Sequence, residues 1–192
     1  MALKRSTVFP DYLYEGQLTI PEELNSDISQ SITASKDSGI TIDMTYGWFT
    51  NKQFPLEGVL PKLAGMMAQV FVEDVVKDFK LKIERDITLL NPYLVSVKPS
   101  YTYQVNIEPQ RWYNGIMFLQ TTNKGSHLCL NNFDSKVYAS QNTQENNVFI
   151  KPKKHKVAFW PSHIPWSLSP NMSMVDSIAL ITSFRADQKR YI

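Results

Sequence analysis

The sequence predicts an α+β fold, in which two helices precede a sandwich or barrel of jelly-roll type with about eight short strands. Three observations support this prediction. Apolar residues recur at helical spacing in the first third of the chain, they alternate with a period of two from residue 81 onward, and turn signals separate the alternating segments. The 192 residues suit a single domain, 1–192, with a helical part at about 20–80 and a β part at about 81–184.

The first helix is expected over about residues 20–36. Thr19 is a residue type that caps helices, and Pro21 suits the first helical turn. Leu24, Ile28 and Ile32 then recur at spacings of four, which places them on one helical face. The pattern therefore predicts an amphipathic helix.

The second helix is expected to begin near Leu56–Pro61 and to run to about Phe79. Its apolar residues follow the 3.6-residue period: Leu60, Leu63, Met67, Val70, Phe71, Val75 and Phe79. Met66 and Met67 lie within this pattern, and we interpret them as flexible core filler against a sheet rather than as a recognition surface.

The β part is expected to consist of short strands separated by turns. The segment 121–125 has the composition of a hairpin turn, and 131–147 is polar and irregular. The expected strands lie at about 81–90, 93–97, 101–107, 116–119, 128–130, 148–150, 156–160 and 178–181.

Composition excludes several classes of protein and site. Lys and Arg total 20 against 18 Asp and Glu, and a net charge of +2 does not favour nucleic-acid binding by bulk charge. The single cysteine, Cys129, excludes an internal disulfide and a cysteine-cluster zinc site. No apolar run approaches the ~20 residues of a membrane-spanning helix. No apolar segment follows Lys4 and Arg5 as a secretory signal would require, so we expect neither a signal peptide nor membrane association.

The order of short motifs in the second half of the chain resembles a known family. The motifs are Asn114–Gln120, a hairpin containing Gly125, Ile150–Lys153, Val157–Ser162, Ile164–Ser167, Pro170–Asn171 and a last apolar strand that ends at Phe184. Together with Gly47–Asn51 upstream, they resemble the iron- and 2-oxoglutarate-dependent oxygenase-like family of tailed bacteriophages, especially cyanophages, over about residues 40–184. The resemblance implies a double-stranded β-helix, a barrel of two antiparallel sheets, with the two helices packed outside it.

The resemblance also implies where a metal site would lie. The family holds iron with two histidines and a carboxylate and binds 2-oxoglutarate with an arginine on a late strand. Aligned on the motifs, the first two ligand positions fall at Asn106 and Glu108, the second histidine position falls at Trp166, and the arginine position falls at Ser177. Glu108 could bind a metal, but the other three residues differ from the family, so we interpret all four as vestigial pocket positions.

From these replacements we expect no cofactor and no catalytic residues. The leading hypothesis is a non-catalytic phage structural or interaction protein, a pseudoenzyme present in the virion and in the host cytoplasm before assembly. Its partners would be other phage structural proteins or further copies of the chain, contacted through 1–10, 186–192 and the loop 131–147. The alternative is an oxygenase (hydroxylase) that uses Fe(II) and 2-oxoglutarate with an altered ligand set. A third possibility is a sugar- or peptide-binding module.

Three further groups of residues have side chains of types found in functional sites. His127, His155, His163 and Asp134 could form an unrelated metal site, but they lack compact ligand spacing, and surface positions are the more common explanation. A basic cluster could contact an acidic partner, although a solvated hairpin is the simpler explanation, and adjacent aromatic residues could anchor an interface. The candidate interface residues are Trp112, Tyr113, Lys151, Lys153 and Lys154.

Overall fold

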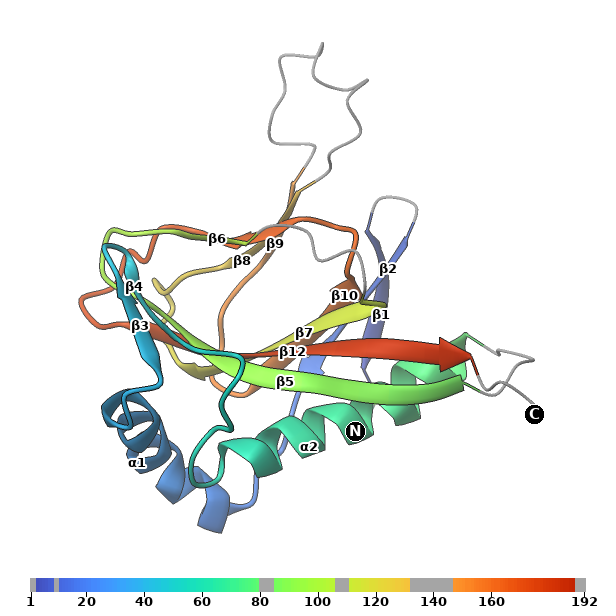
Figure 1. Cartoon of the computed structure of the whole chain (residues 1–192). Helices are drawn as coiled ribbons and strands as arrows, with labels where there is room; N and C mark the ends of the chain where they lie inside the picture. Colours follow the sequence, from blue (N-terminus) through green and yellow to red (C-terminus); the bar gives the residue numbers. More distant parts are fainter. Residues whose placement is uncertain (1–2, 9–10, 80–84, 106–110, 132–146, 189–192) are drawn as a thin grey trace, which may run out of the picture.

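The computed structural model describes residues 3–8, 11–79, 85–105, 111–131 and 147–188 (Figure 1). The helices are α1 (Glu22–Asp37) and α2 (Leu60–Val70), and the π-helical segment η1 (Phe71–Val76) continues α2. The strands are β1 (Lys4–Val8), β2 (Asp11–Gln17), β3 (Thr41–Met44), β4 (Gly47–Thr50), β5 (Arg85–Val97), β6 (Tyr103–Val105), β7 (Tyr113–Gln120), β8 (Leu128–Asn131), β9 (Asn147–Ile150), β10 (Lys156–Pro161), β11 (Trp166–Leu168) and β12 (Ser177–Gln188).

The strands form two antiparallel sheets. The large sheet has the order β1-β2-β10-β7-β12-β5-β4-β3, and the small sheet has the order β6-β11-β8-β9. The strands from β5 to β12 are therefore divided between two four-stranded layers, β5-β12-β7-β10 and β6-β11-β8-β9, and the chain changes layer after every strand except between β8 and β9. This is the arrangement of a double-stranded β-helix, and the predicted fold class is confirmed.

The first third of the chain contains four strands that the sequence analysis did not predict. β1 and β2 extend one edge of the large sheet beyond β10, and β4 and β3 extend the other edge beyond β5. β3 and β4 have only four residues each, and β2 and β4 pair with strands far along the chain, so local periodicity carried little signal. Residues 4–8, which were expected to contact other chains, pair with β2 of the same chain.

Both predicted helices are present, with one local correction at the start of α1. The helix begins after Pro21, which has an extended ψ of 142°, and no side chain caps it. Thr19 is therefore not the helix cap, because Pro21 separates it from the first helical turn. Among the described residues, no helix is long and apolar enough to cross a membrane.

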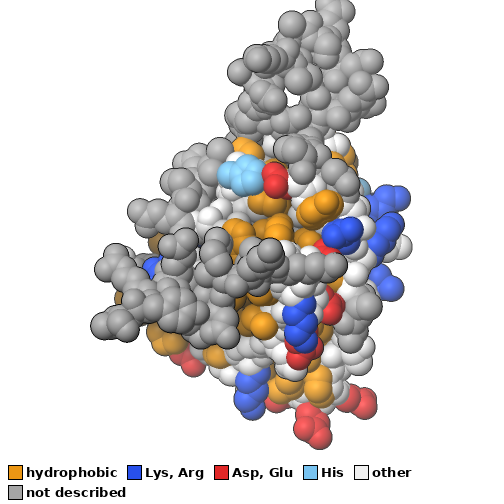
Figure 2. Space-filling model, turned by 90° about the vertical axis from the view of Figure 1, so that its right-hand side faces the viewer, with side chains coloured by type: hydrophobic (Ala, Val, Ile, Leu, Met, Phe, Trp, Pro, Cys, Tyr) orange, Lys and Arg blue, Asp and Glu red, His pale blue; other side chains and the backbone are white. Residues whose placement is uncertain are grey.

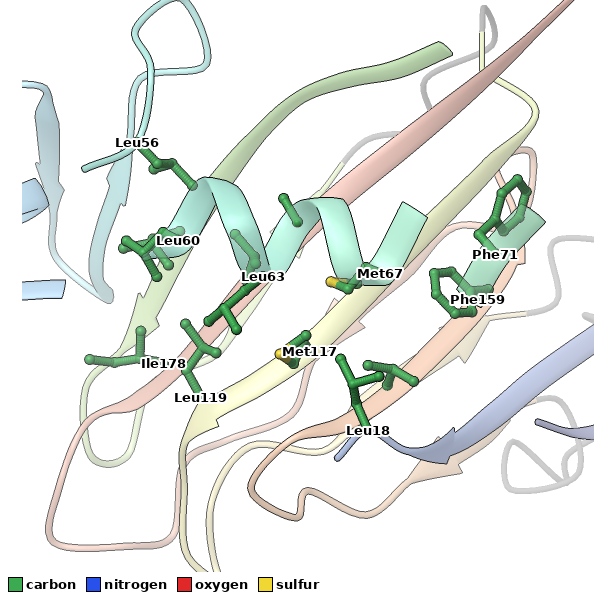
Figure 3. Close-up of a cluster of buried hydrophobic side chains, with 14 of the residues drawn as sticks. Leu18, Leu56, Leu60, Leu63, Met67, Phe71, Met117, Leu119, Phe159 and Ile178 are labelled. Carbon is green, nitrogen blue, oxygen red and sulfur yellow. The ribbon is translucent and has the colours of Figure 1, made fainter. Parts of the chain in front are cut away.

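The helices cover the outer face of the large sheet. Leu60, Leu63, Met67 and Phe71 point from α2 and η1 onto the sheet (Figure 3). All four are fully buried, which confirms that Met67 is core filler. Burying an apolar side chain of this size contributes roughly 1.5–3 kcal/mol, so this face supplies a large share of the folding free energy.

Gly47 begins β4 at a close approach to β5. Its φ is 156°, and an added Cβ would lie 1.9 Å from the backbone oxygen of Ser96. Gly65, in contrast, lies on the exposed side of α2 with no atom within 4 Å of an added Cβ. The two glycines therefore form a matched pair for substitution.

Gly47→Ala is expected to destabilise the protein by roughly 1–3 kcal/mol because β4 must move away from β5. Gly65→Ala should instead stabilise it by up to about 1 kcal/mol, since alanine is the better helix former. For a domain of this size, 1 kcal/mol corresponds to roughly 2–4 °C in melting temperature, which calorimetry resolves. Equal melting temperatures for the two variants would contradict the close approach of β4 and β5.

Candidate functional site at the mouth of the barrel

The barrel formed by β5 to β12 has two distinguishable ends. We call the mouth the end at which β6 and β10 finish and β7 and β11 begin. Trp166, the first residue of β11, pairs with Val105, the last residue of β6, and so lies at the mouth. Ser177, the first residue of β12, pairs with Val97 at the end of β5 and lies toward the opposite end.

The barrel interior is apolar and contains several aromatic rings. Trp166 is 3% exposed, and its ring lies 5.5 Å from that of Trp160 and 5.9 Å from that of Tyr103. The interior cluster consists of Leu13, Tyr93, Val95, Val97, Tyr103, Ile116, Phe118, Leu128, Leu130, Ile150, Ala158, Trp160, Ile164, Trp166, Leu168, Ala179 and Ile181. An indole therefore occupies the position that the resemblance assigns to a metal-binding histidine.

Ser177 is also buried, and its hydroxyl is engaged by its neighbours. It accepts a hydrogen bond from the backbone N–H of Ser126 at 3.0 Å and lies 3.4 Å from the Thr121 hydroxyl. No cation appears among these partners. The other two predicted pocket positions, Asn106 and Glu108, follow directly after β6 and lie outside the described residues.

In the part of the chain that the structure describes, the histidines do not gather into a metal-binding cluster. His163 Nε2 lies 2.8 Å from Asp11 Oδ2 on the exposed rim of the large sheet. Within the described ranges there is no group of three His, Cys, Asp or Glu side chains that could hold a metal. His127 and His155 belong to no such group there, and Asp134 lies outside those ranges.

The candidate interface residues fall into two groups. Tyr113 is 2% exposed, and Trp112 packs against the outer core beside Phe71 at a ring distance of 5.9 Å. Tyr113 as a surface anchor is therefore wrong, because β7 is covered by the helices on this face. The three lysines 151, 153 and 154 are exposed before β10, and their role in an interface stays a prediction.

At the mouth, the structure also brings together several polar side chains that the sequence did not predict to be neighbours. The Arg111 guanidinium donates a hydrogen bond to the Ser183 hydroxyl, and this hydroxyl donates to Asn114 Oδ1 at 2.9 Å. Lys52 Nζ lies 4.4 Å from the centre of the Tyr93 ring. Burial and the positive charge of Arg111 lower the pKa of Lys52 to about 8, so the two cations are close enough to interact.

Backbone hydrogen bonds hold Arg111 in place. Its carbonyl accepts a hydrogen bond from the Ser162 hydroxyl. The next residue, Trp112, donates its N–H to the Phe184 carbonyl at 2.7 Å and accepts at its own carbonyl from the Ser162 N–H at 3.0 Å. The position of this side chain is therefore fixed by β10 and β12, which explains why local sequence patterns around Arg111 could not reveal it.

Figure 2 views the molecule from the side toward which β12 ends. Hydrophobic side chains gather in the middle of this face, and charged side chains lie around them. Convergent polar groups beside an apolar interior are the usual composition of a small-molecule site. The mouth, where Arg111, Ser183 and Asn114 border the interior cluster, is therefore the candidate functional site.

No protein-family model and no curated protein sequence matches this chain. Solved structures do match it. A prolyl-4-hydroxylase from Pseudomonas putida shares 12% identity at a TM-score of 0.63, with 90% of this chain and 92% of that chain covered. The epimerase SnoN of nogalamycin biosynthesis, described as non-heme and α-ketoglutarate-dependent, shares 6% at a TM-score of 0.66, with 90% and 76% covered. HygX from Streptomyces hygroscopicus, solved with nickel, 2-oxoglutarate and hygromycin B, shares 5% at a TM-score of 0.59, with 90% and 82% covered.

These comparisons establish that the chain has the fold of the 2-oxoglutarate/Fe(II) oxygenases. They contradict the leading hypothesis of a non-catalytic phage structural protein, because the similar structures are oxygenases and not virion components. The motif resemblance was right about the fold class. Nothing in the comparisons supports a phage origin or a degenerate site, and they favour the alternative of an oxygenase.

Trp166→Ala is expected to destabilise the protein by ~3–5 kcal/mol, because it removes a buried indole and leaves a void between Trp160 and Tyr103. Phe54→Ala is the control, since Phe54 is 49% exposed and should change stability by less than about 0.5 kcal/mol. Urea unfolding of the two variants and the parent measures both values. A cost below about 1 kcal/mol for Trp166→Ala would show that the indole does not fill the interior.

Proposed function

We propose that this chain is an iron- and 2-oxoglutarate-dependent oxygenase with an altered ligand set, acting at the mouth of the barrel. The observation that carries the proposal is the complete strand order of the barrel, β5-β12-β7-β10 against β6-β11-β8-β9, which is the fold of the similar enzymes. Most of the chain takes part in this match, and the polar side chains of Arg111 and Lys52 lie at the same mouth as Trp166.

The usual set of two histidines and one carboxylate does not fit the described residues. Trp166 offers no metal-binding atom, and the interior around it is apolar. The imidazole nearest in sequence, His163, pairs with Asp11 on the exposed rim. An altered ligand set must therefore include residues beyond those described, and Glu108 is the carboxylate that the sequence offers there, directly after β6.

The described residues have roles that do not depend on the metal. The apolar interior keeps water out of the barrel, and the rigid backbone of residues 111 and 112 holds the Arg111 side chain at the mouth. Electrostatic contacts with a bound reactant are stronger beside an apolar interior and fixed polar groups than they are in water.

The other expectations from the sequence stay predictions. A phage origin and a place in the virion followed from the resemblance, and contacts with phage proteins or further copies of the chain followed also from the charged terminal segments and the polar loop 131–147. Of the segments expected to make these contacts, 3–8 and 186–188 are described, whereas 132–146 and 189–192 lie outside the described residues. An oxygenase would require none of these partners.

Metal binding is the first test of the oxygenase proposal. Purified protein, titrated anaerobically with Fe(II) or Mn(II), is expected to bind about one ion per chain by elemental analysis. Glu108→Ala should weaken this binding about tenfold or more, since even residues that only support metal ligands commonly contribute 10–100-fold. Glu22→Ala, a change in the first turn of α1, is the control and should bind like the parent.

Release of succinate from 2-oxoglutarate in the presence of Fe(II), O2 and ascorbate provides the second measurement. The parent and the Glu22→Ala variant are expected to form succinate, and Glu108→Ala is expected to lose this activity. Protein that binds much less than one metal ion per chain, and forms no succinate, would overturn the oxygenase proposal.

A further inference from the structure

Large apolar side chains are exposed mainly at the end of the molecule opposite the mouth. Of the ten that the described residues expose, six lie there, on β3, on the connection from β5 to β6 and on the connection from β11 to β12. These six, which we call the end patch, are Ile42, Met44, Tyr101, Met172, Met174 and Val175. Figure 1 shows the β3–β4 hairpin and the connection into β12 at the same end of the large sheet. Gathered apolar side chains mark interaction surfaces, whereas single ones do not.

Backbone hydrogen bonds join the three segments that carry the end patch. The Lys98 N–H, just after β5, donates to the carbonyl of Tyr46 in the β3–β4 turn at 2.9 Å. The Ser100 N–H donates to the Asn171 carbonyl at 2.7 Å, and the Asn171 N–H donates to the Tyr101 carbonyl at 3.0 Å. The three segments are therefore neighbours, although they come from distant parts of the sequence.

The connection that carries the two methionines is held in one conformation. Asn171 is fully buried, and its Nδ2 donates to the carbonyls of Val97 and Val175 at 2.8 Å each. On either side of the buried residue at position 173, Met172 and Met174 are 70% and 94% exposed. Because the backbone is already ordered, docking against these side chains would cost little conformational entropy.

Charged side chains of both signs border the end patch. They are Asp43 on β3, Lys98 after β5, Lys124 in the turn after β7, and Asp176 before β12. Gln120 at the end of β7 donates its side-chain N–H to the Asp176 carbonyl at 3.2 Å, so the turn after β7 lies beside the end patch. Within the described ranges none of these four charged side chains forms an ion pair. Two acids and two lysines leave the border without net charge.

The open edge of β3 adds backbone groups to the same surface. Among the described strands, β3 is the last of the large sheet, and its residues 42–44 are exposed. An uncovered edge strand offers N–H and C=O groups that pair readily with another chain, and proteins usually cover such an edge or charge it. Asp43 is the one charged residue on β3. A partner seated on the end patch would cover part of this edge.

We propose that the end patch binds a second copy of this chain through a two-fold contact, in which the apolar side chains of one copy pack against those of the other. In such a contact the same surface meets itself, so each lysine must find its acid within the same patch of the other copy. The two acids and two lysines of the border meet this requirement. The contact needs neither a metal nor oxygenase activity. It leaves both mouths exposed, since they lie at the far ends of the two copies.

The balanced charge favours a second copy over other occupants. An anionic membrane surface or a strongly acidic partner attracts a surface that has excess positive charge, and the border of the end patch has none. The exposed lysines 151, 153 and 154 lie before β10 instead, where Lys154 Nζ is 3.0 Å from Asn25 Oδ1 of α1. Methionine also suits a self-contact, because its flexible and polarizable side chain packs against irregular surfaces.

Light scattering on the full-length protein over a range of concentrations tests the contact. The parent is expected to have twice the mass of one chain and to dissociate on dilution. Met174→Asp should weaken association at least about tenfold, because it places two carboxylates at an apolar contact. Phe54→Asp is the control, since Phe54 is 49% exposed on the connection from β4 to α2, outside the end patch. Both variants should melt like the parent in dilute solution, where the chains are separate.

Three outcomes would overturn the two-fold contact. The first is a parent that stays monomeric at about 100 μM, where a contact of micromolar affinity would be saturated. The second is equal association of Met174→Asp and Phe54→Asp. The third is a monomeric parent that pellets with vesicles of phosphatidylcholine and phosphatidylserine and loses this binding in Met174→Asp, which would assign the end patch to a membrane surface.

A mixture of charge-reversed variants tests the pairing of charges across the contact. Lys98→Glu combined with Lys124→Glu leaves only acids at the border, and Asp43→Lys leaves an excess of lysines. Each variant alone should associate more weakly than the parent because like charges face each other. An equimolar mixture, with a different affinity tag on each variant, should form a heterodimer that co-purifies on either tag. A mixture that associates no better than either variant alone would contradict this pairing.

Discussion

The middle of the large sheet is buried on both faces, and this constraint sets the register of the strands that carry Asn114, Trp160 and Ser183. Alternate residues of each central strand belong to two different apolar clusters. On β7, Met117 and Leu119 face the helices, whereas Ile116 and Phe118 face the small sheet. A shift of one residue in any pairing would exchange the two sets and place side chains in the wrong layer. The register is therefore strongly specified along the whole length of these strands.

The same register continues past the apolar residues to the mouth. Asn114 shares a face with Ile116, Ser183 with Ile181, and Trp160 with Ala158. Asn114 and Ser183 are therefore polar residues that the strand register buries beside the apolar side chains of the interior. The register of the core strands therefore fixes the positions of Asn114, Ser183 and Trp160, and no additional helix or strand is needed to hold them.

An apolar interior also limits where polar chemistry can take place. The side chains between Trp166 and the far end of the barrel are apolar, so a charged reactant there would lose its hydration without compensation. At the mouth, Arg111, Ser183 and Asn114 supply hydrogen-bonding groups that are already oriented by their neighbours. The low polarity of the floor would strengthen those contacts, which makes the mouth the favourable place for a charged ligand.

The sequence was informative where a pattern is local and repeated. The 3.6-residue period from Leu60 to Phe71 located α2, and the alternation along β5, β10 and β12 located the central strands. The strands before residue 51 were not predicted, because β2 and β4 are defined by pairing with β10 and β5, which lie far along the chain. The resemblance identified the fold class and drew attention to Trp166 and Ser177. It could not identify Arg111 and Lys52, which are single cations in loops and become neighbours only through the packing of the sheet.

Those unpredicted strands are also what completes the site. Lys52 follows β4, which is not one of the eight strands of the barrel, and β4 holds this residue next to β5 through the pairs Trp48–Ser96 and Phe49–Val95. The Thr50 hydroxyl reinforces the contact by accepting the N–H of Leu94 at 2.9 Å. Without β4 on this edge of the sheet, the barrel would retain Arg111 but would have no second cation over Tyr93. The N-terminal part of the chain therefore does more than cover the barrel, because it supplies a charged side chain to the barrel mouth.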